Sequence, residues 1–463
     1  MKYFFSILRI IPILIIIAGV CYASDNPGLS RKQIHDMQNS FEKSGSNRAL
    51  LNAVSNNKIK NLTLNRERVN QHDDTFNVTT NAKGITDQQS TGRCWLFAAL
   101  NIMRPVVMDS FNLESFEFSP SYLFFWDKLE KANYFLDTII ETRERAIDDR
   151  ELQAILDAPV PDGGWWNYAV NLIEKYGVVP QAVMLETENT GNSGMLNKIL
   201  GTLLRQYAAE LRSMSESEKE LQKRKQDMLR DCYRVVALHF GTPPESFTWR
   251  VRDKADSLIE QTFTPKEFYS QVVNLDLSQY VTLADYPSFP RQNHYAINFC
   301  TNLTGTPDMD FINIAPTILK QAALKSLLNK EPVWFAADAG WQMEREHGIM
   351  ADDIYDYESL FDIRLDMSKK DRIRYRVSVA NHAMVFVAAD TANNEVTKWH
   401  VENSWGTDYG DSGYWTLYDD WFDKYVFNLI IHKKYLRDQE RVLLDKPVQR
   451  IPAWDPLRAA FLK

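Results

Sequence analysis

One cysteine of this chain stands in a setting suited to nucleophilic chemistry. Cys94 lies in the run QQSTGRCWLF, after a polar loop and directly before bulky apolar residues. We expect it to begin a helix, because a helix N-terminus favours the thiolate form. Gln88, six residues earlier, offers a side-chain N–H to the oxyanion that forms when a thiolate attacks a carbonyl. The alternative is a buried cysteine that packs as a small hydrophobic residue.

A thiol nucleophile needs a base, and the base needs a partner that orients it. His382 opens the apolar run HAMVFVAAD, which is typical of a buried strand, and Asn403 follows the strand-like TKWHV. His382 would exchange a proton with Cys94, while Asn403 would fix the imidazole tautomer. Trp405 would shield their hydrogen bond from water. His400 is the rival base, but it lies only three positions before Asn403 on the same segment.

These residues resemble the papain-like cysteine peptidases, and most closely the bleomycin hydrolase / aminopeptidase C family. The resemblance runs from about residue 76 to the C-terminus, through DGGWWNYAVNLIEKYGVVP, EPVWFAADAG, NSWG…YG…GYW and IPAWDPL. It implies an α+β, papain-like fold in which a helical half and an antiparallel β half enclose the site. It also implies a thiol peptidase whose catalytic positions are Gln88, Cys94, His382 and Asn403.

The resemblance further implies how the substrate is bound. The pair Gly163-Gly164 would let a peptide backbone approach closely, since glycine has no Cβ; the residues alone equally allow an ordinary turn. Trp405 would border the substrate. The C-terminal arm would lie in the cleft, with the carboxylate of Lys463 near the α-ammonium group of the substrate, which makes an aminopeptidase; a frayed terminus is the alternative. A papain-like endopeptidase is the nearer alternative function, and a non-catalytic scaffold on the same fold is the more distant one.

Two departures separate this chain from ordinary papain-like enzymes. The segment TGRCW lacks the first cysteine of the signature C-G-[SA]-C-[WY], and 288 residues separate Cys94 from His382, where roughly 130–150 are usual. A large insertion is therefore predicted between the two halves, and the resemblance implies that it is helical. The predicted divisions are a signal peptide (1–23), an N-terminal extension (24–75), the helical half with the nucleophile (76–190), the insertion (191–315), the β half (316–437) and the C-terminal arm (438–463).

The N-terminus predicts export. Lys2 and Arg9 precede an apolar stretch from Ile10 to Val20, and Ala23 offers a small residue for cleavage. This stretch is short for a membrane span, although an anchor is the alternative. We therefore expect a secreted or periplasmic protein. Related enzymes form hexameric rings, which implies a homo-oligomer here as well.

Composition and charge narrow the range of partners. The chain is 44% hydrophobic and 25% charged, as in soluble globular proteins. Cleavage after Ala23 would remove Lys2 and Arg9 and no acid, so the net charge would go from −8 to −10. This negative charge argues against nucleic-acid binding. Peptide substrates are the partner that the resemblance implies. Cys232 and Cys300 form either a disulfide or, as we favour, two buried thiols, and since neither has a metal-ligand spacing, no metal or other cofactor is expected.

Overall fold

The computed structural model describes residues 28–41 and 45–460, so the predicted signal peptide and Lys463 lie outside the described residues. The chain divides into one unit that ends at Leu62 and a second that begins at Thr63. The first unit holds α1 (Arg31–Ser40) and α2 (Gly45–Asn56), while α3 (Ile59–Thr63) ends on the first residue of the second unit. The second unit contains every residue of the predicted site that the structure describes.

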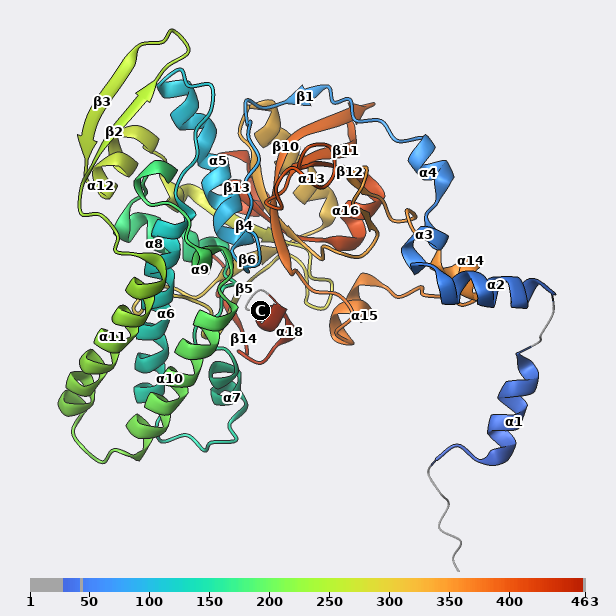
Figure 1. Ribbon diagram of the computed structural model, residues 1–463, viewed down its shortest axis with the longest axis horizontal. Helices are drawn as coiled ribbons and strands as arrows, with labels where there is room; N and C mark the ends of the chain where they lie inside the picture. Colours follow the sequence, from blue (N-terminus) through green and yellow to red (C-terminus); the bar gives the residue numbers. More distant parts are fainter. Residues whose placement is uncertain (1–27, 42–44, 461–463) are drawn as a thin grey trace, which may run out of the picture. The chain divides into compact units, whose positions relative to one another are not determined.

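The helical half is built around α5 (Cys94–Ser110) and α6 (Pro120–Glu141). The Ser119 side chain accepts a hydrogen bond from the Tyr122 backbone N–H, and Pro120 occupies the first turn of α6, so this start is encoded locally. Pro105 does not end α5, which continues to Ser110. Helices α10 and α11 pack beside α6 (Figure 1). The other helices here are α7 (Arg150–Asp157), α8 (Trp166–Tyr176), α9 (Glu188–Gly191), α10 (Gly194–Ser213) and α11 (Glu218–Phe240).

The β half contains a twelve-stranded sheet with the order β14-β5-β6-β4-β13-β7-β10-β11-β12-β9-β8, and β1 (Val78–Thr79) pairs with β10. The central pairs are antiparallel, whereas β4/β6, β5/β14 and β9/β12 are parallel. The strands are β4 (Tyr280–Ala284), β5 (Asn293–Ile297), β6 (Asp310–Asn313), β7 (Val333–Ala337), β8 (Met343–Glu344), β9 (Ile349–Met350), β10 (His382–Ala392), β11 (Glu395–Glu402), β12 (Tyr414–Tyr418), β13 (Val426–His432) and β14 (Gln449–Ile451).

The central strands are apolar throughout because both faces of the sheet are covered. Along β7, Trp334 and Ala336 belong to one buried cluster together with the helical half, whereas Val333, Phe335 and Ala337 belong to a second cluster on the opposite face. Helices α13 (Pro316–Leu328) and α16 (Asp419–Tyr425) contribute to this second cluster. The α+β, papain-like fold class predicted from the sequence is confirmed.

The inserted region differs from the expectation in its second part. Residues 194–240 are helical, as α10 and α11, but the hairpin of β2 (Phe247–Arg252) and β3 (Leu258–Phe263) follows, and β4, β5 and β6 then join the main sheet. Short apolar runs such as YVTLA do not distinguish a strand from a buried helical segment by periodicity. The insertion is therefore helical only in its first part.

Short elements complete the chain, and in the described residues none of the helices has both the length and the hydropathy needed to cross a bilayer. These elements are α4 (Arg66–Asn70), η1 (Gln181–Val183), α12 (Pro265–Phe268), η2 (Tyr269–Val273), η3 (Leu277–Gln279), α14 (Tyr357–Phe361), α15 (Lys369–Arg374), η4 (Lys433–Tyr435), α17 (Asp438–Arg441) and α18 (Pro456–Ala460).

Candidate active site

Cys94 is the first residue of α5, and its side chain is 5% exposed. No side chain caps this helix, so the first backbone N–H groups have no side-chain acceptor. The N–H groups of Cys94 and Trp95, together with that of Ala383 in β10, hydrogen-bond toward the Cys94 sulfur. The sulfur is thus buried at the junction of the two halves and surrounded by backbone donors.

Gln88 is buried and is held at both ends of its amide. Its Oε1 accepts a hydrogen bond from the Ser404 hydroxyl at 2.7 Å, and its Nε2 donates to the Thr91 carbonyl. Its backbone N–H also donates to the Ser404 carbonyl at 2.8 Å. An amide nitrogen carries two N–H bonds, so one remains for a further acceptor. The loop before Cys94 therefore presents an oriented donor.

His382 and Asn403 meet because of the sheet register. His382 is the first residue of β10 and Asn403 directly follows β11, and these strands are antiparallel with Val385 opposite Glu402. The start of one strand and the end of the other thus lie at the same edge of the sheet. His382 Nε2 donates to Asn403 Oδ1 at 2.8 Å, and the imidazole stacks on Trp405 with ring centres 4.6 Å apart. This tautomer leaves Nδ1 available as a base.

Burial opposes charge on the thiol and on the imidazole when each is taken alone. It raises the pKa of Cys94 to about 11 and lowers the pKa of His382 to about 4. The backbone donors around the sulfur favour the thiolate, and the Asn403 side chain favours the imidazolium. Transfer of the thiol proton to the imidazole would create both charges together, and each would then stabilise the other.

A buried carboxylate, Asp162, is one of the groups that hold the loop before Cys94 in place. Asp162 accepts a hydrogen bond from the Gly92 backbone N–H at 3.1 Å and pairs with Lys128 at 2.7 Å, and both side chains are buried. Burial alone would raise the pKa of Asp162, but the Lys128 charge and the hydrogen bonds around the carboxylate hold the pKa below its usual value. The other two donors are Ser193 and Asn197.

Gly163 and Gly164 follow this carboxylate and are both buried. The Gly163 carbonyl accepts a hydrogen bond from Lys131 Nζ at 2.8 Å. A Cβ at Gly164 would lie 2.7 Å from the Trp95 indole, so the packing against α5 excludes a side chain there. The structure thus gives Gly164 a packing requirement at the start of α5, and substrate binding by the glycine pair stays a prediction.

Comparisons with known proteins agree on one family. The model of the Peptidase C1-like family matches residues 28–458. The chain belongs to this family. It is 36% identical over 416 residues to aminopeptidase C of Streptococcus thermophilus, covering 88% of this chain and 94% of the relative. It is 37% identical over 381 residues to aminopeptidase C of Listeria monocytogenes, covering 82% and 86%. The crystal structure of pepw from Lactobacillus rhamnosis HN001 superposes with a TM-score of 0.90 at 34% identity, covering 93% of this chain and 99% of that one.

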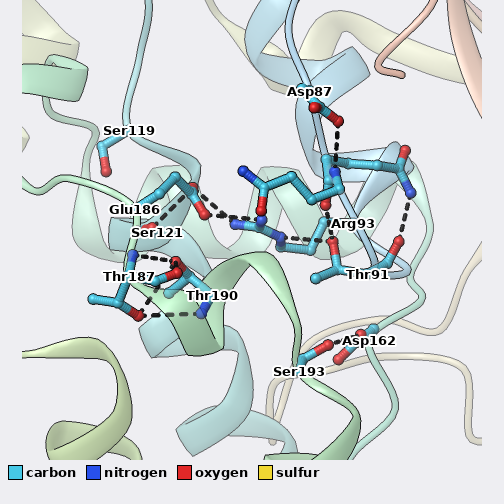
Figure 2. A network of polar contacts seen from close by, with 12 residues as sticks. Asp87, Thr91, Arg93, Ser119, Ser121, Asp162, Glu186, Thr187, Thr190 and Ser193 are labelled. Atoms are coloured by element: carbon cyan, nitrogen blue, oxygen red, sulfur yellow. Dashed lines mark hydrogen bonds and ion pairs between the residues drawn. The ribbon is translucent and has the colours of Figure 1, made fainter. Parts of the chain in front are cut away.

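Membership of the Peptidase C1-like family makes the chain a cysteine-type peptidase, and ion pairs formed by buried arginines hold its candidate site together. Arg93, next to Cys94, is fully buried and forms a paired hydrogen bond with the Glu186 carboxylate at 3.0 and 2.9 Å. Its Nε also donates to the Thr91 hydroxyl at 3.0 Å, as Figure 2 shows. This contact was not predicted from the sequence, although a charged residue directly before an apolar helix is a visible signal for it.

A second ion pair that was not predicted from the sequence joins α5 to β11. Arg104 and Glu402 are both about 1% exposed, and Arg104 Nη2 lies 2.6 Å from Glu402 Oε2. Glu402 directly precedes Asn403, so the pair connects the helix that begins with Cys94 to the strand that leads to Asn403. Burial raises the pKa of Glu402 to about 7, although the Arg104 guanidinium acts in the opposite direction.

The C-terminal arm is anchored in the Peptidase C1-like domain as far as the structure describes its side chains. Strand β14 pairs with β5, and Leu457 is buried in the core shared with the helical half. Arg458 is also buried, and it donates to the carbonyls of Phe299 at 3.0 Å and Ala154 at 3.2 Å. The terminal Lys463 lies beyond the described residues, so its predicted place near the substrate stays a prediction.

The remaining candidate residues have other surroundings. The His400 ring lies between two aromatic rings, with its centre 4.6 Å from that of Phe76 and 4.9 Å from that of Tyr414. Cys232 and Cys300 are free, buried thiols, in agreement with the favoured reading. The side chains of Glu344, Glu346 and His347 come close enough to bind a metal ion. However, the Glu344 carboxylate already accepts the backbone N–H groups of Glu346 and His347.

Proposed function

We propose that this peptidase is an aminopeptidase in which Cys94 is the nucleophile and His382 is the base. The observation that carries the proposal is the hydrogen bond of 2.8 Å between His382 and Asn403, at the sheet edge where the Ala383 N–H approaches the Cys94 sulfur. This arrangement leaves the second imidazole nitrogen to take the thiol proton. The name aminopeptidase C, borne by relatives of nearly full length, supports cleavage at the amino end.

In the proposed reaction, the sulfur bonds to the carbonyl carbon while its proton passes to His382 Nδ1. The resulting oxyanion accepts hydrogen bonds from Gln88 Nε2 and the Cys94 backbone N–H. His382 then protonates the leaving amine as the C–N bond breaks, and a water molecule hydrolyses the thioester that remains on the sulfur. Asn403 holds the imidazole in the tautomer that this sequence requires, and Trp405 keeps water from their hydrogen bond.

The experiment compares the purified protein with the variants Cys94→Ala and Cys232→Ala on alanyl-aminomethylcoumarin and its N-acetyl analogue. We expect cleavage of the free-amine substrate alone, a loss of at least about 10³-fold in kcat/KM with Cys94→Ala, and little change with Cys232→Ala. Full activity of Cys94→Ala would overturn the mechanism. Equal cleavage of both substrates by the unmodified protein would instead make it an endopeptidase.

We propose further that the C-terminal arm sets the amino-end specificity through the Lys463 carboxylate, as opposite charges at short range attract. A truncation after Arg458 would retain the buried anchor of the arm. We expect this variant to cleave the N-acetyl substrate and to lose its preference for a free amine. An unchanged preference would remove the arm from the proposal.

Export and self-assembly also remain proposals. Export predicts that a protein recovered from outside the cytoplasm begins near Ser24, which mass spectrometry of the intact chain would establish. Assembly predicts a mass several times that of the 53.7 kDa chain in light scattering. An unprocessed N-terminus or a monomer would contradict the respective proposal.

A further inference from the structure

An exposed arginine lies beside the tryptophan that stacks on the proposed base. The guanidinium carbon of Arg345 is 5.3 Å from the ring centre of Trp405 and 5.4 Å from that of Tyr409. Since Trp405 is itself 4.6 Å from the His382 ring, the guanidinium is no farther from the imidazole than these two steps allow. Arg345 is therefore a neighbour of the catalytic centre without belonging to it.

A backbone hydrogen bond, rather than an ion pair, holds the loop that carries Arg345 in place. The Arg345 carbonyl accepts the Gly410 N–H at 2.8 Å, which fastens this loop to the loop that follows Trp405. A Cβ on Gly348 would lie 2.8 Å from the Gly410 Cα, so the two loops are in close contact. Within residues 28–41 and 45–460, no carboxylate forms an ion pair with Arg345, although Glu346 is adjacent in sequence. A cation held on aromatic faces and not neutralised is available to an anion from solution.

The chemistry proposed above determines which part of a substrate passes this arginine. His382 must reach the leaving amine to protonate it, so the chain that follows the scissile bond extends past the imidazole and Trp405. An extended peptide advances about 3.5 Å per residue. Groups on the first or second residue after the scissile bond therefore come within the range of the Arg345 side chain.

We propose that Arg345 binds a carboxylate on the first or second residue after the scissile bond and so favours di- and tripeptides, or acidic residues at those positions. This inference rests on the function proposed above and adds the class of substrate. In a dipeptide or tripeptide the carboxylate is the C-terminus itself, whereas in a longer peptide only an Asp or Glu side chain can supply it. Guanidinium–carboxylate pairs are geometrically specific, which suits this role better than a lysine would.

The experiment measures kcat/KM on Ala-Ala and on Ala-Ala amide, which differ only in the leaving-side carboxylate. We expect the unmodified protein to prefer the free acid by about fivefold, an effect of the size that one partly exposed ion pair provides. Arg345→Gln should abolish this preference, and Arg345→Lys should retain part of it. A high salt concentration should reduce it in the unmodified protein, because screening weakens exposed pairs.

Two controls separate this effect from others. Alanyl-aminomethylcoumarin has an uncharged leaving group, so its turnover should be the same in Arg345→Gln and the unmodified protein. Arg234→Gln removes an exposed charge from α11 and should leave the preference unchanged. Equal turnover of acid and amide by the unmodified protein, or a preference that survives in Arg345→Gln, would overturn this inference alone. Cleavage of no free-amine substrate would overturn the proposed function and this inference with it.

Discussion

Two buried carboxylates flank the candidate site and are stabilised differently. Asp162 binds the loop that precedes Cys94, and Glu402 directly precedes Asn403. Asp162 accepts hydrogen bonds from Lys128, Ser193, Asn197 and the Gly92 backbone. Glu402 pairs with Arg104 alone, and its other oxygen has no hydrogen-bond partner in the described part of the chain. The pKa of Asp162 is accordingly lowered and that of Glu402 is raised to about 7. The number of donors around a buried carboxylate thus decides whether burial or pairing prevails.

The largest expected effect is a loss of stability on the Asp162 side. Asp162→Ala would leave the Lys128 ammonium buried without its counter-charge, so the free energy of unfolding should fall by about 3–5 kcal/mol. Urea denaturation measures this, with Asp148→Ala as the control because Asp148 is an exposed acid. A loss as small as that of the control would show that the Asp162 network does not hold the helical half together.

A matched pair of neutral substitutions tests the comparison directly. Asp162→Asn removes a charge that several donors support, so we expect a loss of about 2–3 kcal/mol. Glu402→Gln removes a charge that burial in the fold disfavours, so the loss should be about 1 kcal/mol or less. Denaturation of both variants at pH 7 gives the order, and a larger loss from Glu402→Gln would reverse our interpretation of the two sites.

The two carboxylates should also respond to pH with opposite sign. The contribution of Asp162 to the free energy of unfolding is present above its unfolded pKa of 3.8, and it is lost as the pH falls below that value. Folded Glu402 instead keeps a proton that the unfolded chain releases above 4.5, so its contribution declines as the pH rises from 4.5 to about 7.

Urea denaturation between pH 3 and 8 checks this difference. The deficit of Asp162→Asn relative to the unmodified protein should shrink toward pH 3, while that of Glu402→Gln should shrink between pH 4.5 and 7. If the two deficits changed with pH in the same way, the predicted difference between the carboxylates would be contradicted.

The smallest effect concerns a buried group with aromatic neighbours. His400 stacks on Phe76 and Tyr414, and burial lowers its pKa to about 4, so it is neutral at pH 7. His400→Phe keeps the volume and the stacking and should change the unfolding free energy by about 1 kcal/mol or less. The rate of peptide cleavage should remain within about twofold of the unmodified protein's, which corresponds to less than 0.5 kcal/mol. A large loss of activity would restore His400 as a candidate base.

Local signals in the sequence were sufficient for the parts of the site that depend on one segment. The helix from Cys94 and the strands from His382 and before Asn403 follow from apolar runs and their flanking residues. Asp162 and Glu402 were not identified, because their partners lie far away in the sequence: Gly92 is 70 residues from Asp162, and Arg104 is 298 residues from Glu402. A single sequence contains no information on such pairings.

The dependence on contacts between distant residues also explains why the strands of the inserted region were not predicted. The long charged helices of residues 194–240 have a clear helical pattern, and only the break between α10 and α11 escaped notice. The strands β4, β5 and β6 are only four or five residues long, too short for their periodicity to identify them as strands. They are recognisable as strands from the sheet that they extend. Tertiary context therefore decides the second part of the insertion.

The hydrogen bond between Ser404 and Gln88 joins residues 316 positions apart, which has a consequence for biosynthesis. A ribosome makes the thiol and its loop early and the imidazole, the amide and the tryptophan only near the end of translation. A nascent or prematurely terminated chain consequently carries the sulfur without the base that we propose for it. Under the proposed mechanism, the peptidase is inert until nearly the whole polypeptide has been made and folded, so translation itself delays its activity.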